Sequence, residues 1–187
     1  MRSRRPFIPQ RRPIFIGCEG ESECGYVGLL QDLIRDAVLP VHLIIEDLGL
    51  GAGDPLSRIE MAIRRLEHLK RTRTSPPERF VLLDSDQAER DRNRADDARR
   101  LAVAHNIHIV WQRPCFEAVV LRHLPNRSTN RPPETLEAER ALNREWPDYE
   151  KPMSRTELAT RIDLAAVLQA AAVEPELGAM LRCMGLI

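Results

Sequence analysis

The chain has 187 residues, of which 43% are hydrophobic, and its formal net charge at neutral pH is zero. This length suits one domain, or one domain with a helical extension, and the hydrophobic content is ample for a core. A neutral chain lacks the global basic field that attracts nucleic acid. No apolar run approaches the roughly 20 residues of a membrane span, and the run after the first arginines is too short for a secretory signal. We therefore expect a cytoplasmic protein.

The chain opens with basic residues and then alternates between strand and helix patterns. Residues 1–12 hold five arginines and no acid, which predicts a basic arm that either contacts phosphates or serves as a solubilising tail. Residues 13–18 form an apolar run typical of a strand buried on both faces. Apolar positions recur at helical spacing over residues 23–38, with Ser22 as the expected N-cap. A second strand is expected at residues 41–45.

A glycine-rich loop follows the second strand. Glycine occupies every second position over residues 49–53, a pattern that loosely resembles a phosphate-binding loop before a helix. The Lys-Ser/Thr pair of a Walker motif is missing, which favours a lid or a plain loop. Asp54 and Pro55 are typical of the cap and first turn of a helix, and its apolar face continues to Leu69.

Two further strands complete the pattern, at residues 79–83 and 107–111. Between them, residues 87–105 predict a charged surface helix with a narrow apolar stripe. Pro114 opens a short helix. This alternation predicts an α/β fold, with an open, mainly parallel four-stranded sheet covered by helices. The stripe of the charged helix consists of Ala88, Ala95, Ala98, Leu101 and Ala102.

We divide the chain into a basic N-terminal arm (1–12), an α/β domain (13–124) and a helical C-terminal extension (125–187). The extension begins with a proline-rich loop and continues with two or three helices. Helical spacing predicts two apolar faces. One consists of Leu158, Ile162, Ala165, Leu168 and Ala172, and the other of Leu177, Leu181 and Met184.

Acidic side chains follow the first and third strands. Glu19 comes directly after the first, and Asp84 and Asp86 follow the third. In extended backbone, residues two apart point to the same side, so neighbouring strands would bring all three carboxylates around one metal. Mg²⁺ suits such ligands, relieves their repulsion and can activate a water. On spacing alone, ordinary strand-end roles are slightly favoured, with Asp86 as a helix cap.

Other polar residues are weaker candidates. Glu21 and Glu23 lie near the start of the first helix, where they favour its dipole. Glu117 lies in the first turn of the helix after Pro114, so the same role applies, although it is also a candidate further ligand at this edge of the sheet. Lys151 stands alone in the sequence and is expected on the surface, with a phosphate contact as the less favoured role.

Three motifs occur in order along the chain. They are Cys18-Glu19-Gly20-Glu21-Ser22-Glu23 followed by Tyr26, then Leu83-Asp84-Ser85-Asp86, then Pro114-Cys115-Phe116-Glu117. Together they resemble the RloB-like family over roughly residues 13–175. This family comprises prokaryotic proteins associated with restriction–modification and abortive-infection loci. It is similar to the Toprim fold of topoisomerases, bacterial primases and overcoming-lysogenization-defect nucleases.

The resemblance implies a Toprim-like nuclease in phage defence that cleaves DNA or RNA with Mg²⁺ or Mn²⁺. By position, Glu19 matches the Toprim glutamate, a general acid/base or metal ligand. Asp84 and Asp86 match the metal-binding Asp-x-Asp pair, and Glu117 matches the acid of the third motif and is a second catalytic candidate. The chain departs from many relatives after Gly20, with Glu-Ser-Glu in place of Lys-Thr-Glu, and so lacks a lysine available for phosphate contact.

Two alternatives to a nuclease stay open. The first is a non-catalytic partner or sensor subunit that binds nucleic acid or a nucleotide and signals to another protein of a defence locus. The zero net charge favours it, because the sequence shows no obvious basic groove. The second is a structural module that self-associates through its C-terminal helices.

Overall fold

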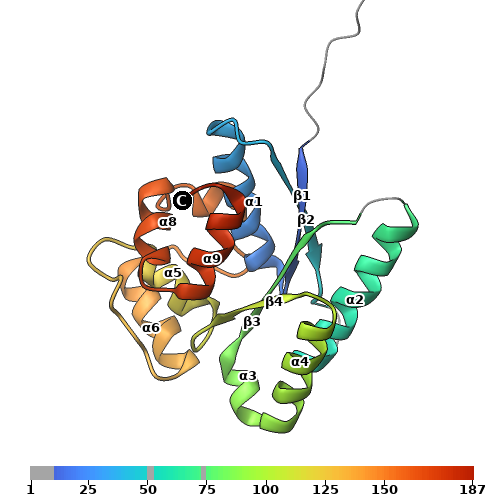
Figure 1. The fold of residues 1–187 in the computed structure, drawn as a ribbon. Coiled ribbons are helices and arrows are strands. Elements are labelled where there is room, and N and C mark those ends of the chain that lie inside the picture. Colours follow the sequence, from blue (N-terminus) through green and yellow to red (C-terminus); the bar gives the residue numbers. More distant parts are fainter. Residues whose placement is uncertain (1–10, 50–52, 73–74) are drawn as a thin grey trace, which may run out of the picture.

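The protein is described by a computed structural model over residues 11–49, 53–72 and 75–187 (Figure 1). Its described part contains a four-stranded sheet of order β2-β1-β3-β4, and every pair of neighbouring strands is parallel. The expected open α/β sheet is therefore confirmed. The strands are β1 (Arg12–Cys18), β2 (Val41–Asp47), β3 (Glu78–Asp84) and β4 (His108–Gln112).

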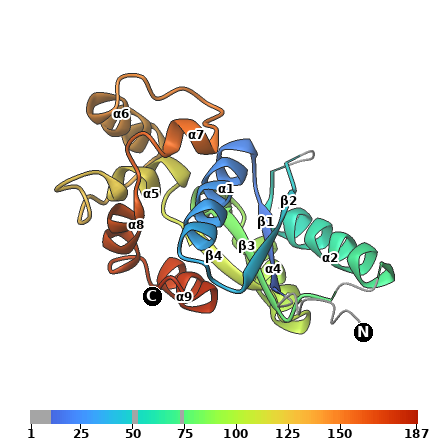
Figure 2. The same ribbon diagram turned by 90° about the horizontal axis from the view of Figure 1, so that it is seen from above.

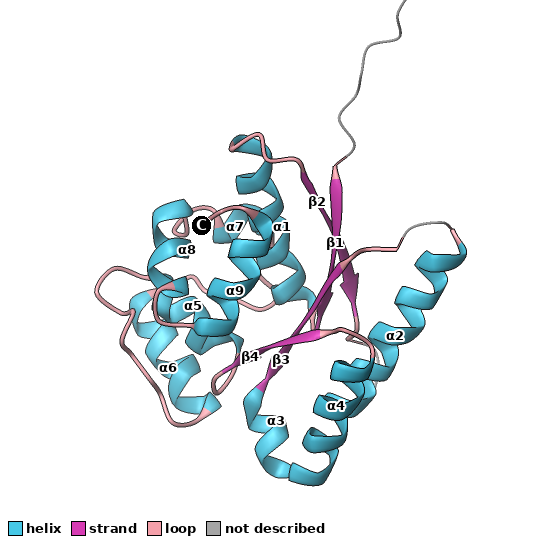
Figure 3. Cartoon of the chain, in the orientation of Figure 1, coloured by secondary structure: helices cyan, strands magenta, loops and turns pink. Residues whose placement is uncertain are grey.

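Helices connect the strands and continue beyond the sheet (Figure 3). The helices within the sheet region are α1 (Glu21–Asp36), α2 (Pro55–Arg71), α3 (Ser85–Arg90), α4 (Arg92–Ala104) and α5 (Phe116–His123). Those of the C-terminal region are α6 (Thr135–Glu145), α7 (Arg155–Leu158), α8 (Leu164–Ala171) and α9 (Pro175–Met184).

The sheet separates two hydrophobic cores. Successive residues of a strand point to opposite faces, so Ile14 enters one core and Phe15 the other. The core around Ile14 is completed by α1, α5 and the C-terminal helices, for example through Leu30 and Leu181. The core around Phe15 is completed by α2 and α4, for example through Ile59. Figures 1 and 2 show these two helical layers on either side of the sheet.

The starts of several helices test the expected caps. Asp54 caps α2 as expected, because its side chain accepts from the backbone N–H groups of Leu56 and Ser57. The expectation that Ser22 caps the first helix is wrong. The helix begins at Glu21, and the buried Ser22 hydroxyl instead accepts from the backbone N–H of Met153 at 3.2 Å.

The single charged helix expected over residues 87–105 is two helices. The chain turns at Asp91, whose side chain accepts from the Arg94 N–H and caps α4. The predicted apolar stripe is nevertheless correct, since its four alanines are buried and Leu101 is half-buried. The stripe continues across the turn between the two helices, and α3 and α4 contact each other.

The C-terminal region differs from its prediction in number and phase. Residues 125–187 hold four helices in place of two or three. Leu158 and Ile162 are buried as expected, but Ala165, Leu168 and Ala172 are exposed. The reason is Asp163, which caps a new helix and breaks the phase with the preceding turn. The buried face of α8 is Val167, Ala170 and Ala171, and the face of Leu177, Leu181 and Met184 is confirmed.

Two predictions fall largely on residues outside the described part. The basic arm is described only at Arg11 and Arg12, and Arg12 already belongs to β1. Residues 50–52 of the glycine-rich loop also lie outside it. None of the described helices is long and apolar enough to cross a membrane.

Candidate metal centre

The carboxyl ends of β1 and β3 bring Glu19 and Asp84 together. These strands are parallel neighbours, so their carboxyl ends meet at one edge of the sheet, as the sequence predicts. Glu19 Oε2 accepts from the backbone N–H of Asp84 at 2.9 Å, and its Oε1 accepts from Gln87 Nε2 at 2.7 Å. Burial raises the pKa of Glu19, and the neighbouring charge of Asp86 adds to this. The ends of the first and third strands thus share one polar site.

Asp84 is half-buried at the end of β3. Its Oδ1 is buried and has no hydrogen-bond partner among the described residues. Burial holds the Asp84 pKa well above its usual range, and the charges of Glu19, Glu23, Glu117 and Asp86 raise it further. A buried carboxylate without a partner is unfavourable, so Asp84 is the residue of the site with most to gain from a bound cation.

Asp86 does not extend the strand. Because β3 ends at Asp84, Asp86 lies in the first turn of α3, and the expectation of two carboxylates on one side of extended backbone is wrong. It is not the helix cap either, because Asp84 holds that position. Its Oδ2 accepts from Thr135 Oγ1 at 2.9 Å and lies 3.5 Å from Arg90 Nη2, while its Oδ1 is buried without a partner in the described part of the chain. Asp86 therefore lines a separate hollow, beside the start of α6.

Glu23 and Glu117 enlarge the acidic site. Both are buried and both lie in first turns, of α1 and α5, where a helix dipole favours negative charge. Burial, followed by the charges of Glu19 and Glu117, raises the pKa of Glu23 to about 7. Together with Asp84 they line a hollow of about 340 Å³, which we call the acidic hollow. The sequence placed Glu23 correctly at a helix start but gave no signal of its burial.

Lys151 also lines the acidic hollow. Its expected surface position is confirmed, because the residue is exposed, but it is not isolated. Its Nζ lies 2.6 Å from Glu117 Oε1 and 3.0 Å from Glu139 Oε1, with half of the side chain exposed. Partial burial lowers its pKa, but its hydrogen bonds and the charges of Glu117 and Glu139 raise it by more. The loop that carries Lys151 packs closely against α1 at Gly25. This approach requires glycine, because a side chain there would collide with the Met153 carbonyl. Nothing in the local sequence signals this long-range approach.

The chemistry of the site suits a hard divalent cation, although its present arrangement does not enclose one. Within the described ranges, no group of three or more His, Cys, Asp or Glu side chains is placed to hold a metal. The donors are nevertheless carboxylate oxygens, which Mg²⁺ and Mn²⁺ prefer. Two of these oxygens, on Asp84 and Asp86, are buried without partners among the residues that the structure describes. A cation would satisfy these oxygens and relieve the repulsion that raises the pKa of Asp84.

The fold and the site define the class of the protein. It is an open, parallel α/β domain with a buried acidic cluster at the carboxyl ends of its two central strands. A family model for RloB-like protein matches residues 14–176, and the chain belongs to this family. The resemblance read from the three motifs is thereby confirmed. No curated protein and no solved structure matches the chain.

Proposed function

We propose that the chain is a Mg²⁺- or Mn²⁺-dependent nuclease that hydrolyses phosphodiester bonds of DNA or RNA. The observation that carries this proposal is Asp84 Oδ1, which is buried and has no hydrogen-bond partner in the described ranges, together with the four further carboxylates whose charges raise the Asp84 pKa. Lys151 pairs with Glu117 and Arg90 with Asp86, which leaves Glu19, Glu23 and Asp84 without an ion-pair partner among the described residues. Such an arrangement is costly to stability. Such a cost is typical of a site kept for binding or chemistry.

The proposed roles follow from position. Asp84, Glu19 and Asp86 would hold the metal, with Glu19 releasing Gln87 and Asp86 turning from Thr135. When bound, the metal would stabilise charge on a phosphate and lower the pKa of a water. Glu23, with a pKa of about 7, is suited to accept or donate a proton at neutral pH. Lys151 would bind a phosphate oxygen and is oriented by Glu117, which assigns Glu117 a positioning role.

The setting of this activity rests on the family. We propose that the protein acts in phage defence within the prokaryotic cytoplasm, together with another protein encoded at the same locus. Lys151 compensates, in this proposal, for the lysine that the first motif lacks, because its ammonium reaches the acidic hollow from the C-terminal region.

A second candidate function is nucleic-acid or nucleotide binding without turnover, as a partner or sensor subunit. One observation favours it. The cation that the acidic hollow already contains is the Lys151 ammonium, and the described acids do not close around a metal. In this alternative, Lys151 permanently takes the place that the nuclease proposal gives to a divalent ion.

Calorimetry separates the two candidates. Mn²⁺ and Mg²⁺ are titrated into the wild type, Asp84→Asn and the control Asp36→Asn, which changes an exposed acid at the far end of α1. The nuclease proposal expects binding that Asp84→Asn abolishes and Asp36→Asn preserves, and metal-dependent cleavage in parallel assays with single-stranded DNA, duplex DNA and RNA. Absence of metal binding, both alone and with an oligonucleotide present, would favour the non-catalytic alternative.

A further inference from the structure

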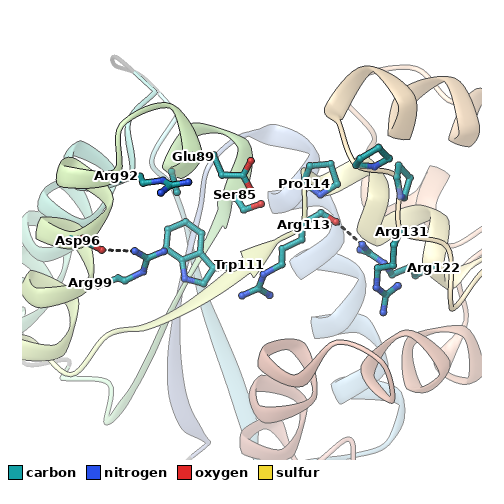
Figure 4. Close-up of a pocket in the computed structure, with 13 residues that line it drawn as sticks. Ser85, Glu89, Arg92, Asp96, Arg99, Trp111, Arg113, Pro114, Arg122 and Arg131 are labelled. Atoms are coloured by element: carbon teal, nitrogen blue, oxygen red, sulfur yellow. Dashed lines mark hydrogen bonds and ion pairs between the residues drawn. The ribbon is translucent and has the colours of Figure 1, made fainter.

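A second hollow lies beside the acidic one and has the opposite chemistry. It measures about 510 Å³ and is lined by five arginines and Trp111, with Glu89 and Asp96 as its lining acids (Figure 4). We call it the arginine cleft. It lies between α3, α4 and β4 on one side and α5 with the loop before α6 on the other. The arginines are Arg92, Arg99, Arg113, Arg122 and Arg131.

The arginine cleft adjoins the acidic hollow through the chain itself. Ser85 and Pro114 line the cleft, while Asp84, one residue earlier, lines the acidic hollow. The Pro114 carbonyl accepts from the backbone N–H groups of Ser85 and Asp86, at 3.0 and 3.1 Å. A polymer lying in the cleft would therefore run along the segment that carries the proposed metal ligands.

Arg122 is the residue that most requires an anion. Its side chain is 1% exposed, and its Nε lies 3.0 Å from Glu174 Oε1. Its Nη2 donates to the Arg113 carbonyl at 2.5 Å. Its Nη1, however, is buried without a hydrogen-bond partner in the described part of the chain. A phosphate oxygen is a strong partner for such a charged donor.

The neighbouring charges do not satisfy this need. Glu174 Oε1 serves two guanidinium groups, at 3.0 Å from Arg122 and 3.3 Å from Arg131. Arg113 is paired with Glu176 at 2.8 Å. Burial lowers the pKa of Arg122, and the positive charges of Arg131 and Arg113 lower it further. Three guanidinium groups thus share two carboxylates on this side of the cleft.

The opposite side of the cleft offers an aromatic surface. Trp111 of β4 is half-buried, and the Arg99 guanidinium lies 5.1 Å from the centre of its ring. Arg92, nearby on α4, is exposed and forms no hydrogen bond or ion pair with the described residues (Figure 4). Aromatic rings and arginines in one groove are typical of sites that bind single-stranded nucleic acid, where free bases stack and phosphates pair with guanidinium groups.

We propose that the arginine cleft binds a single-stranded segment of nucleic acid, with a phosphate held by Arg122 and Arg131 and a base stacked on Trp111. Duplex DNA presents no free base face for this stacking. The inference deepens the proposed function, because it names a single strand as the substrate that reaches the acidic hollow. In that respect it rests on the proposed function.

The test measures binding in EDTA, so that no metal and no turnover are involved. Trp146→Phe leaves Trp111 as the sole tryptophan of the chain and therefore as the fluorescence reporter. Oligothymidylate and oligouridylate of about 12 nucleotides are titrated at several salt concentrations, against duplex DNA and free mononucleotides. We expect quenching of Trp111 by at least one of the two single strands, together with weaker binding of duplex and mononucleotide.

Variants give the expected magnitudes. Trp111→Ala removes the reporter, so its affinity is measured by the fluorescence anisotropy of a labelled oligonucleotide, and the variant should bind about 5- to 150-fold more weakly, the value of one stacked base. Arg131→Ala and Arg92→Ala should each reduce the slope of log affinity against log salt by about 0.7. Arg92 is exposed, and Arg92→Ala breaks no hydrogen bond or ion pair with the described residues, so we expect this variant to fold normally. Arg71→Ala, an exposed position at the far end of α2, is the matched control and should leave binding unchanged.

The inference is overturned if Trp111 is not quenched, if duplex or mononucleotide binds as tightly as the strands, or if both cleft arginine variants behave like Arg71→Ala. These outcomes are independent of the nuclease proposal, because that proposal depends on metal binding by Asp84 and this experiment excludes metal.

Discussion

The acidic hollow and the arginine cleft lie side by side, yet their charged side chains are neutralised by counter-ions to different extents. In the acidic hollow, Asp84 and Glu23 lie among like charges, and Lys151 pairs with Glu117 but with neither of them. In the arginine cleft, the buried Arg122 has a buried counter-ion in Glu174, but its Nη1 has no partner among the described residues. The first hollow thus has fewer cations than carboxylates, and the second has a guanidinium donor that its carboxylates do not satisfy.

The comparison shows how a net charge of zero can hide a functional separation of charge. Opposite charges on a surface normally mix, which limits the potential at any one place. Here the charges separate across the segment from Asp84 to Asp86 and the Pro114 carbonyl that it contacts. A phosphodiester with a divalent ion complements both sides, since the ion carries positive charge and the phosphate negative charge.

The largest expected effect contrasts the two aspartates of the third-strand motif. Asp84 lines the acidic hollow and Asp86 a separate hollow, so their substitutions should not be equivalent. We expect Asp84→Asn to reduce metal-dependent cleavage by more than about 100-fold, and Asp86→Asn by about 10-fold, because Asp86 reaches the metal only after it turns from Thr135. Rates measured at saturating Mn²⁺ check this. Equal losses in the two variants would contradict this difference between the two metal ligands.

The next effect tests the arginine cleft through stability. Glu174→Gln leaves the buried Arg122 without its carboxylate and should lower the free energy of unfolding by about 3–5 kcal/mol. Its control is Glu176→Gln, which removes a more exposed pair with Arg113 and should cost about 1 kcal/mol or less. Urea denaturation measures both. A small loss in Glu174→Gln would mean that Arg122 reaches water or another acceptor, and would weaken its role in phosphate binding.

The contrast between the hollows also explains what the sequence could and could not predict. The proximity of Glu19 and Asp84 could be predicted, because the carboxyl ends of neighbouring strands in a parallel sheet meet at one edge. The order of the strands, which makes these two strands neighbours, could not be read from the sequence pattern. Asp86 could not be placed, since the pattern does not show where a strand ends and a helix begins. The pairing of Lys151 and the burial of Arg122 could not be predicted for a different reason. Their partners, Glu117 and Glu174, lie 34 and 52 residues away, and tertiary packing alone sets such contacts.

Burial gave no local signal either. Glu23 occupies an ordinary position for an acid in the first turn of a helix, and the sequence supports only a favourable interaction with the dipole. Its raised pKa arises because the hollow removes water and collects other carboxylates. Such effects follow from the whole fold and leave no mark on the residues beside Glu23.

Glu23 supplies a pH dependence that sharpens the acidic half of the comparison. Its pKa rises from 4.5 to about 7 on folding, so the folded state binds more protons than the unfolded state between these pH values. The free energy of unfolding should therefore fall as pH rises from about 4.5 to about 7, by about 3 kcal/mol. Glu23→Gln should remove this loss, which makes the variant more stable than the wild type at pH 8 but similar at pH 4.5. Denaturation at the two pH values tests this. If the variant and the wild type differ in free energy of unfolding by the same amount at both pH values, Glu23 ionises normally.

The smallest effect concerns Lys151, where the chain provides a natural control. Lys70 is the only other lysine, and it is exposed near the end of α2. Lys151→Met leaves the buried Glu117 without its cation and should cost about 1–2 kcal/mol of stability, a value reduced by the half-exposure of the lysine. Lys70→Met should be near neutral.

Mn²⁺ calorimetry on the same variants adds a second measurement. If the Lys151 ammonium competes with a divalent ion, Lys151→Met should bind Mn²⁺ more tightly than the wild type. If Lys151 instead only positions Glu117, Mn²⁺ affinity should stay unchanged while cleavage falls, and the acidic hollow would then accept a metal without displacing its own cation.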